Sequence, residues 1–567
     1  MQSARFPFQG WAKRLFAGVI LVAIGFTVEQ DGKAAQNPSA DWKFHATINA
    51  PWAQSDDDQS FDSPVTAAGL CRSSQFTSAN PYLPTANVDA IAGEPVNNSG
   101  FSNLGCRAPQ NETTVAVNPT DPNNLVAGAN DYRVCCDSVG LNDGSGWAYA
   151  SFDAGLTWTN VQLPGLTAQT GGRGVFKRVD SAGDPAVAFG PDGTVYYANI
   201  VFHRIRAASG IAVSVSHDGG LSWGEPNMVA YDDAGNFVND KEFIAAGPDG
   251  KVVVTWTRFN LGPHGAGYRE SPIVMAISKD GGKTWNRQGS PVSDRAHPFD
   301  QGSMPQVAPD GTLYVAYEGA TPSSGYSQDA TVVARSTDDG RTFTNIEVGR
   351  VFDDLDCYPI FGGRQTLTGE HFRLNSYPSF SIDPTNGKLA IAWTDDRGAG
   401  NCGTGASSFV GVTNAKVVLV TSPNGTSFSA PQVISVGDTV FPGVAANNGR
   451  IAVSYYTRAY TASHNPTLCD VKTGVGNITE GVPSAIDVCL DYAARTSANS
   501  YAVETRLTSE GSNPYIEFAN GSFIGDYSQI ALGSNGVAHP VWTDFRGNPN
   551  PGGTRANQDV YTAAYIP

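Results

Sequence analysis

Hydrophobic and polar residues alternate along short stretches of this chain, and tight-turn dipeptides separate many of these stretches. Alternation with a period of two residues predicts strands with one buried face. An Asp-Gly or Asn-Gly dipeptide between two such stretches is a strong local signal for a β-hairpin. These dipeptides lie at 192–193, 249–250, 310–311, 386–387, 448–449 and 535–536, and 120–124 takes the same place in the first unit. The β-branched and aromatic strands that follow the dipeptides are 194–199, 251–257, 312–318, 388–394, 450–457 and 537–543.

A second kind of turn recurs at regular intervals. Residues 278–285 read Ser-Lys-Asp-Gly-Gly-Lys-Thr-Trp, in which the glycines permit a positive φ and the Asp side chain accepts backbone N–H groups across the bend. The pattern returns at 151–158, 216–223 and 336–343, and 421–428 is a weaker copy with Pro423 at the Asp position. The Asp positions of the four good copies are Asp153, Asp218, Asp280 and Asp338, which are 65, 62 and 58 residues apart. A turn repeated at this period indicates one supersecondary unit used several times.

The pattern Ser-x-Asp-x-Gly-x-Thr-Trp resembles the Asp-box (bacterial neuraminidase) repeat of sialidase-type β-propellers. The resemblance implies that the Asp ties down a hairpin and that the Trp or Phe packs between neighbouring blades. Units open near residues 112, 184, 240, 303, 376, 441 and 526. We therefore predict an all-β propeller of seven four-stranded antiparallel blades. Six blades is the alternative, because typical sialidases resemble six-bladed rings.

The N-terminal segment has the pattern of a secretory signal. Arg5, Lys13 and Arg14 form a basic region, and 15–27 is an apolar run that is short for a membrane span. We predict a signal peptide over 1–34, a loop-rich lead-in over 35–111 and the propeller over 112–567, with an uncleaved anchor as the alternative. The last unit shows only three strands, and 42–50 in the lead-in is the candidate for the strand that closes the ring. The predicted location is extracellular or periplasmic, with no membrane attachment after signal cleavage.

Charge and cysteine content narrow the partners. The net charge of −17 argues against a nucleic-acid partner. The eight cysteines favour disulfides in an oxidising compartment, with Cys357–Cys402 and Cys469–Cys489 as candidate pairs. The sequence has no Cys-x-x-Cys pair, so we expect no zinc site built on cysteine. We also predict that the protein uses no cofactor. The acidic loop at 142–144 is a candidate for structural Ca²⁺.

Charged residues gather where the first strand of a unit begins and where the second strand ends. In the predicted propeller these two places share the end of each blade opposite the repeated turns. The strand starts carry Glu112, Asp184, Asp240 with Glu242, and Asp526 with Tyr527, and the strand ends carry Arg133, Arg258, Asp395, Asp396, Arg397, Arg458, Asp544 and Arg546. A rim of this kind suits a sugar-like or anionic ligand, because Arg binds carboxylates bidentately and paired carboxylates serve as general acid and base. The alternative is that the Asp–Arg pairs only hold the ring together, and the near-identical stretches 394–398 and 543–547 favour a repeated structural role.

The resemblance to sialidases implies a mechanism with a three-Arg clamp on a substrate carboxylate, an Asp acid/base and a Tyr nucleophile assisted by a Glu. By position, Arg258, Arg397 and either Arg458 or Arg546 are the clamp candidates. Asp184 or Asp240 is the acid/base candidate. Tyr527 with Glu242 is the nucleophile candidate, and Tyr377 is the second choice.

One family feature is missing from the chain. Sialidases carry an aromatic-Arg-Ile-Pro segment before the first Asp box, and the nearest string here is 203–206, which lacks the Pro. We expect a secreted glycoside hydrolase of the sialidase-like superfamily that cleaves a terminal sugar, with acidic sugars among the candidates. The alternative is a non-catalytic extracellular propeller that binds glycan or protein on the same rim, and the missing segment favours it.

Overall fold

The structure, a computed structural model, describes residues 87–91, 108–135, 142–262 and 267–567. The last range has gaps at 355, 362, 400, 405, 407, 462–463, 465–468, 470–487, 515–520, 522 and 548–556. The predicted signal peptide and the candidate strand at 42–50 lie outside the described residues.

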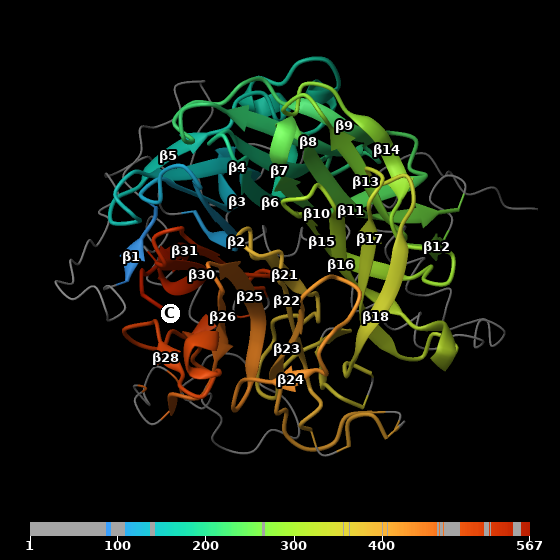
Figure 1. The fold of residues 1–567 in the computed structure, drawn as a ribbon. Coiled ribbons are helices and arrows are strands. Elements are labelled where there is room, and N and C mark those ends of the chain that lie inside the picture. The colour runs from blue at the N-terminus through green and yellow to red at the C-terminus, as the bar shows by residue number, and fades with distance from the viewer. Residues whose placement is uncertain are drawn as a thin grey trace, which may run out of the picture.

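Seven antiparallel sheets surround a central axis (Figure 1), which confirms the prediction of an all-β propeller with seven blades. Blade 1 consists of β2 (Gln110–Val117), β3 (Leu125–Cys135), β4 (Asn142–Ser151) and β5 (Thr159–Gln162), and blade 2 of β6 (Ser181–Phe189), β7 (Val195–Phe202), β8 (Ser209–Ser216) and β9 (Asn227–Asp232). Blade 3 consists of β10 (Phe237–Ala246), β11 (Val252–Leu261), β13 (Ile273–Ser278) and β14 (Asn286–Pro291). Blade 4 consists of β15 (Asp300–Val307), β16 (Leu313–Ala320), β17 (Asp329–Ser336) and β18 (Thr344–Val351). Strand β12 (Tyr268–Glu270) adds to the third blade, beside β11.

Blade 5 consists of β21 (Ser379–Ile382), β22 (Leu389–Asp395), β23 (Lys416–Ser422) and β24 (Gln432–Val433). Blade 6 consists of β25 (Thr439–Asn447), β26 (Arg450–Thr457), β27 (Asp491–Thr496) and β28 (Thr505–Arg506). Blade 7 consists of β29 (Gln529–Leu532), β30 (Ala538–Gly547), β31 (Asn557–Thr562) and β1 (Val88–Asp89). A small hairpin of β19 (Ile360–Phe361) and β20 (Arg364–Gln365) precedes blade 5. The described helices are short 3-10 turns: η4 (Ala168–Thr170), η5 (Gly174–Arg178), η6 (Pro248–Gly250), η8 (Pro322–Ser324) and η11 (Ser497–Asn499).

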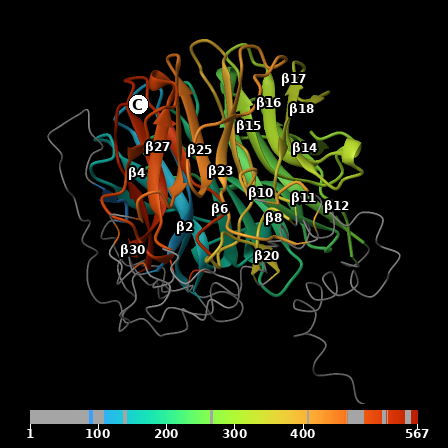
Figure 2. The same ribbon diagram turned by 90° about the horizontal axis from the view of Figure 1, so that it is seen from below.

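The second strand of each blade lies deep in the ring. Every residue of β7, β16 and β22 is buried. Alternation in the sequence predicted one buried face for these strands, whereas both of their faces are covered. The reason is that successive side chains point to opposite faces of a strand, and each blade packs between two neighbouring blades. Figure 2 shows the blades standing side by side around the ring.

The repeated turns share one set of hydrogen bonds. In 278–285, the Asp280 carboxylate accepts from the Thr284 N–H (2.9 Å), from the Thr284 hydroxyl (2.6 Å) and from the Ser278 hydroxyl (2.8 Å). The Ser278 hydroxyl accepts from the Gly282 N–H (2.9 Å), and Trp285 Nε1 donates to the Gly282 carbonyl (3.1 Å). The corresponding carboxylates that make the same bonds are Asp153, Asp218 and Asp338. All four carboxylates are thus engaged within their own turns.

These turns also pack against the preceding blade. A Cβ atom on Gly220 would lie 2.7 Å from Val126 Cγ2 of blade 1, and one on Gly340 would lie 2.6 Å from Met275 Sδ of blade 3. Both glycines also have a positive φ, so a larger residue is disfavoured by the neighbouring blade and by the backbone. In the weaker copy at 421–428, Asn424 accepts the Ser427 N–H (2.9 Å) in place of the Asp.

The ring is closed by the N-terminal part of the described chain. Strand β1 pairs with β31, with Val88 opposite Thr562 and Asp89 opposite Tyr561. Residues 88–89 therefore form the outermost strand of the last blade, the position for which the sequence analysis proposed 42–50. Blade 7 thus combines both ends of the described chain in one sheet.

Two disulfides confirm the pairings suggested by the sequence, Cys357–Cys402 and Cys469–Cys489. The first disulfide joins the segment between blades 4 and 5 to the loop after β22. No helix among the described residues has the length and apolar character needed to cross a bilayer.

Candidate functional site

The candidate site lies at the axis, where the first strands of the blades begin. In β2, β6, β10, β15 and β25, the register with the second strand shifts at the same point. Each shift contains two residues, and the first of the two has a φ value between 50° and 66°; these residues are Glu112, Asp184, Lys241, Gly302 and Phe441. A bulge of this kind redirects a side chain, and a positive φ costs a non-glycine residue on the order of 1 kcal/mol or more. The repeated bulges bring the side chains of blades 1, 2 and 3 together.

Lys241 is the centre of the resulting group, which we call the axial cluster: Glu112, Asp184, Asp240, Lys241, Glu242, Arg373, Asp526 and Tyr527. The Lys241 ammonium lies 2.7 Å from Asp184 Oδ2, 2.8 Å from Asp526 Oδ2 and 3.2 Å from Glu112 Oε1. All four of these side chains are 0–1% exposed. One buried cation therefore joins carboxylates from blades 1, 2 and 7.

A second cation reaches the cluster from the segment before blade 5. Arg373 donates from Nε and Nη2 to the two oxygens of Asp526, both at 2.7 Å. Its guanidinium also stacks 4.3 Å from the centroid of the Phe523 ring. Asp526 is thus bound by Arg373 and Lys241 together, and the cluster links the first three blades to the last one.

Burial and neighbouring charges set the protonation of the cluster. Burial raises the pKa of Glu112, Asp240 and Glu242 well above the usual range for carboxyl groups, and the Asp184 carboxylate raises each of them further. Burial alone would also raise the pKa of Asp526, but Arg373 and Lys241 hold that pKa far below its usual range. The cluster therefore holds protonated acids beside an ionised carboxylate.

Several buried oxygens of this region have no hydrogen-bond partner among the described residues. They are Asp184 Oδ1, Asp240 Oδ2, both carboxyl oxygens of Glu242 and the Tyr377 hydroxyl. Buried polar atoms are normally paired, so unpaired ones in a group mark a site that is completed by protons, water or a ligand. Other buried carboxyl oxygens of the described residues share this property, such as both oxygens of Asp300, but the axial cluster gathers several of them around one lysine.

The structure brings the four catalytic candidates from the sequence into this one cluster. Asp184 contacts Lys241 directly, and Asp240 and Glu242 flank Lys241 in β10. The Tyr527 ring lies 5.9 Å from Lys241 Nζ and packs on Phe243 with ring centroids 5.2 Å apart. The Tyr527 hydroxyl donates to the Pro185 carbonyl (3.3 Å), and burial together with Glu112 and Asp184 raises its pKa well above 10.

The clamp candidates Arg397 and Arg546 each pair with a carboxylate of their own blade. Each donates from Nε and Nη2 to the carboxylate two residues before it, at 2.6–2.7 Å. In each case a Trp two residues before that carboxylate also donates to it at 2.9 Å. Arg133 makes the same pairing with Asp131 in blade 1. Asp-x-Arg is thus a repeated local brace at the end of the second strand.

Of the other two clamp candidates, Arg458 contacts neighbouring loops and Arg258 contacts strands of its own blade. Arg458 pairs with Asp438 and donates to the Thr368 carbonyl (2.8 Å). Arg258 donates to Asn260 Oδ1 (3.0 Å) and to the Gly289 carbonyl in β14 (3.3 Å). The contacts described for the four arginines lie in their own blades, in neighbouring loops and, for Arg397, at the Arg350 carbonyl of β18 (3.2 Å). None of these contacts joins two of the clamp candidates, and their convergence on one ligand stays a prediction.

Sequence reasoning missed Lys241 and Arg373. Lys241 stands between two residues that it named, and regular alternation would place Lys241 on the opposite face from both. The bulge at Lys241 removes that alternation. Arg373 lies outside the repeated units, in the segment between blades 4 and 5, and no local pattern marks it. The sequence pattern did identify Glu112 and Asp526 as charged residues at the beginning of first strands, but it predicted no catalytic or binding role for either of them.

Two cavities lie along the axis. A small one of about 20 Å³ is lined by Lys241, Tyr377, Asp526 and Tyr527 among others, and this volume suits one water molecule. A larger one of about 550 Å³ continues toward the face that carries the turns between first and second strands. Phe243, Met304 and Ser379 line both cavities. The axial cluster therefore closes the inner end of a channel.

Possible metal ligands occur at another place in the ring. Carboxylate oxygens of Glu318, Asp329 and Asp353, all buried, lie within 4.8 Å of one another, and oxygen ligands of this type are those that Ca²⁺ takes. Residues 142–144, expected to be a loop, instead begin strand β4, and Asp143 pairs there with Arg204 and accepts from Ser181. Structural Ca²⁺ remains a prediction from the sequence.

A buried acid in blade 5 gives a prediction on pH and stability. Burial raises the pKa of Asp396 to about 8, while its carboxylate accepts the Asn414 N–H (2.7 Å). An acid whose folded pKa is raised binds more protons in the folded state, so stability falls as the pH rises from about 4 to about 8. In the unmodified protein we expect the free energy of unfolding to fall by on the order of a few kcal/mol across this pH range. Asp396→Asn keeps a hydrogen-bond acceptor but cannot ionise, so the fall should be absent from its urea unfolding curves. The control is Asp233→Asn at an exposed site, and parallel pH curves for Asp396→Asn and the unmodified protein would refute the assignment.

No protein-family model matches the chain, and no curated protein matches it. Solved structures with a similar arrangement include a protein of unknown function from Dyadobacter fermentans (16% identity, 63% of this chain and 93% of that chain, TM-score 0.39). Another is a Hadza microbial sialidase (12% identity, 78% of this chain and 73% of that chain, TM-score 0.38). A third is a Penicillium chrysogenum α-L-arabinanase complexed with arabinobiose (13% identity, 85% of this chain and 98% of that chain, TM-score 0.40). At these values the overlaps assign the chain to no family.

Proposed function

We propose that the protein is an exported glycoside hydrolase of the sialidase-like type, which removes a terminal sugar from glycans at the axial cluster. The observation that carries this proposal is the meeting of a tyrosine with carboxyl groups of contrasting protonation at one point on the axis. Tyr527 lies beside protonated acids and beside carboxylates paired with Lys241. Glycosidases that use a tyrosine nucleophile need this combination.

The contacts suggest a role for each residue. Tyr527 is the nucleophile, and Glu242, whose charge acts on Tyr527, is the candidate base. Because burial raises the pKa of Glu242, it takes the Tyr527 proton only after losing its own. Asp240 is the better candidate for the general acid, because burial raises its pKa and keeps it protonated. Asp184 is the less favoured candidate, since it is the closest partner of Lys241.

Export is supported by the pattern of the N-terminal residues and by the two disulfides. Disulfides persist in oxidising compartments and are rare in the reducing cytosol. We therefore place the activity outside the cytoplasm, on glycans of the surroundings.

A second candidate is a non-catalytic propeller that binds glycan or protein. Two observations favour it: the cluster carboxylates are 0–2% exposed, and three of the four clamp candidates already pair with a carboxylate. An Arg that is saturated by its own brace is less available to a substrate carboxylate.

A panel of chromogenic aryl glycosides, with sialosides and other acidic sugars first, tests the proposal. We expect turnover that falls by at least about a hundredfold in Tyr527→Phe and in Asp240→Asn. Matched controls are Tyr501→Phe and Asp233→Asn, which should leave turnover unchanged, with melting temperatures checking the fold of each variant. Normal turnover in both folded test variants would refute the roles. Absence of turnover on the whole panel would support the binding propeller, and a glycan array would follow.

A further inference from the structure

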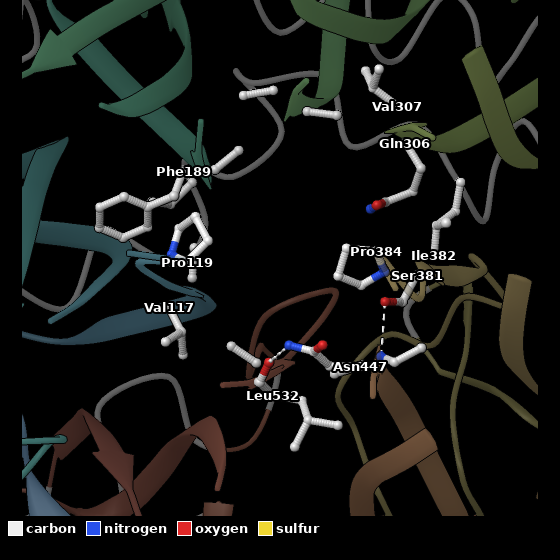
Figure 3. A pocket seen from close by; sticks show the side chains of 18 of the residues that line it. Val117, Pro119, Phe189, Gln306, Val307, Ser381, Ile382, Pro384, Asn447 and Leu532 are labelled. Carbon is white, nitrogen blue, oxygen red and sulfur yellow. Dashed lines mark hydrogen bonds between the residues drawn. The ribbon is translucent and has the colours of Figure 1, made fainter. Parts of the chain in front are cut away.

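The larger axial cavity differs from the axial cluster in the chemistry of its lining. Its wall is formed by the ends of the first strands and by the turns that follow them, and Figure 3 shows lining residues from several blades around it. Its volume of about 550 Å³ lies in the range of small-molecule sites in proteins. The cavity is open toward solvent at one end and reaches Phe243 and Met304 at the other.

The lining carries no charged side chain among the described residues. It is mainly aliphatic, with Val117, Val307, Ile382 and Leu532 around the mouth in Figure 3. Proline rings add to this wall in five blades: Pro119, Pro191, Pro248, Pro309 and Pro384. The whole chain has a net charge of −17, so an uncharged lining of this size is unusual for its surface. A charged ligand would find no partner of opposite charge in this cavity, and burying a charge without a partner is unfavourable.

A few amide and hydroxyl groups provide polarity. Gln306 donates to the Phe380 carbonyl (3.2 Å), and Asn447 donates to the Leu532 carbonyl (3.0 Å). Ser381 accepts the Ala446 N–H (3.0 Å). Figure 3 shows the Gln306 and Asn447 side chains at the cavity wall, where the carbonyl oxygen of each amide can accept a hydrogen bond from a ligand hydroxyl.

We infer that this cavity binds an uncharged, mainly aliphatic small molecule that carries a hydroxyl group. The aliphatic part contacts the valine, leucine and proline wall, and the hydroxyl group donates to Gln306 or Asn447. The inference goes beyond the proposed hydrolase, because the cavity lies on the other side of Phe243 and Met304 from the carboxylates. A channel that holds only solvent is the competing view.

The experiment uses the full chain and an uncharged naphthylamine fluorophore that brightens in apolar surroundings. Three competitors with ten carbon atoms each differ in the head group and its charge: decanol (neutral hydroxyl), decanoate (carboxylate) and decylammonium (ammonium). We expect decanol to displace the fluorophore at concentrations at least about tenfold lower than either ion requires. Equal displacement by all three, or no binding of the fluorophore, would overturn the inference.

Variants locate the binding site. Val307→Trp fills the mouth of the cavity and should reduce fluorophore binding at least about tenfold. The matched control is Val503→Trp, where the valine is 60% exposed and does not line the cavity. An equal loss in both variants, or no loss in folded Val307→Trp, would place the binding elsewhere. If Val307→Trp does not fold, Gln306→Leu takes its place, and the preference for decanol over decane, measured first on the unmodified protein, is expected to weaken; an unchanged preference in Gln306→Leu and in Asn447→Leu would overturn the inference.

Discussion

Replacing Lys241 with alanine is expected to lower the free energy of unfolding by roughly 3–5 kcal/mol. The reason is that Lys241 is the shared partner of three acidic side chains on three blades, all of them fully buried. Its removal takes the ammonium group away from the ionised Asp526 and from its acidic neighbours Glu112 and Asp184. Equilibrium unfolding in urea, followed by tryptophan fluorescence, measures the effect.

Two comparisons separate this effect from a general loss of side-chain packing. Lys279→Ala removes an ammonium group that pairs with Asp339 at the surface, with the lysine 55% exposed, and should change stability by less than about 1 kcal/mol. The loss in Lys241→Ala should also shrink as the pH falls, because protonation of the remaining carboxyl groups removes their repulsion. A loss no larger than that of Lys279→Ala, or one independent of pH, would show that the axial cluster does not stabilise the ring.

The architecture was predictable because the signals that define it are local. Each repeated turn is held by bonds over at most four residues, such as Asp280 to Thr284, so its pattern is visible in eight consecutive residues. The dipeptide turns are equally local, and together they gave the number of blades. The ring-closing strand was less predictable, since Val88 and Asp89 are a short pair whose partner lies at the far end of the chain.

The site was predictable only in part. The strand starts in blades 2, 3 and 7 pointed to Asp184, Asp240 and Tyr527, because position in a propeller unit indicates which end of the blade a residue occupies. Lys241 was hidden by a bulge at a non-glycine residue, for which the sequence has no reliable mark. The arginines show another limit: Asp395 and Arg397 stand two residues apart and pair with each other, and the charge pattern alone did not distinguish this local pairing from a role in binding a ligand.

The second large effect is expected from the disulfide between Cys357 and Cys402, which closes a loop with a sequence separation of 45 residues. Replacing both cysteines with serine should lower the free energy of unfolding by roughly 2–4 kcal/mol, since the crosslink limits the freedom of the unfolded chain. The matched control replaces Cys469 and Cys489, with a separation of 20 residues, and should lose less because the loop is shorter. Urea unfolding of the three proteins under non-reducing conditions provides the measurement.

The position of the first disulfide adds a consequence for the axial cluster. Cys357 begins the segment that carries Arg373, and Phe372 of that segment packs near Phe441 of blade 6, with ring centroids 6.4 Å apart. If the disulfide holds this segment against the ring, it also holds Arg373 on Asp526. The cysteine replacement and Arg373→Met should then be less than additive in stability, with a coupling of about 0.5 kcal/mol or more. Strict additivity would mean that the disulfide acts only on the unfolded chain and that packing alone positions Arg373.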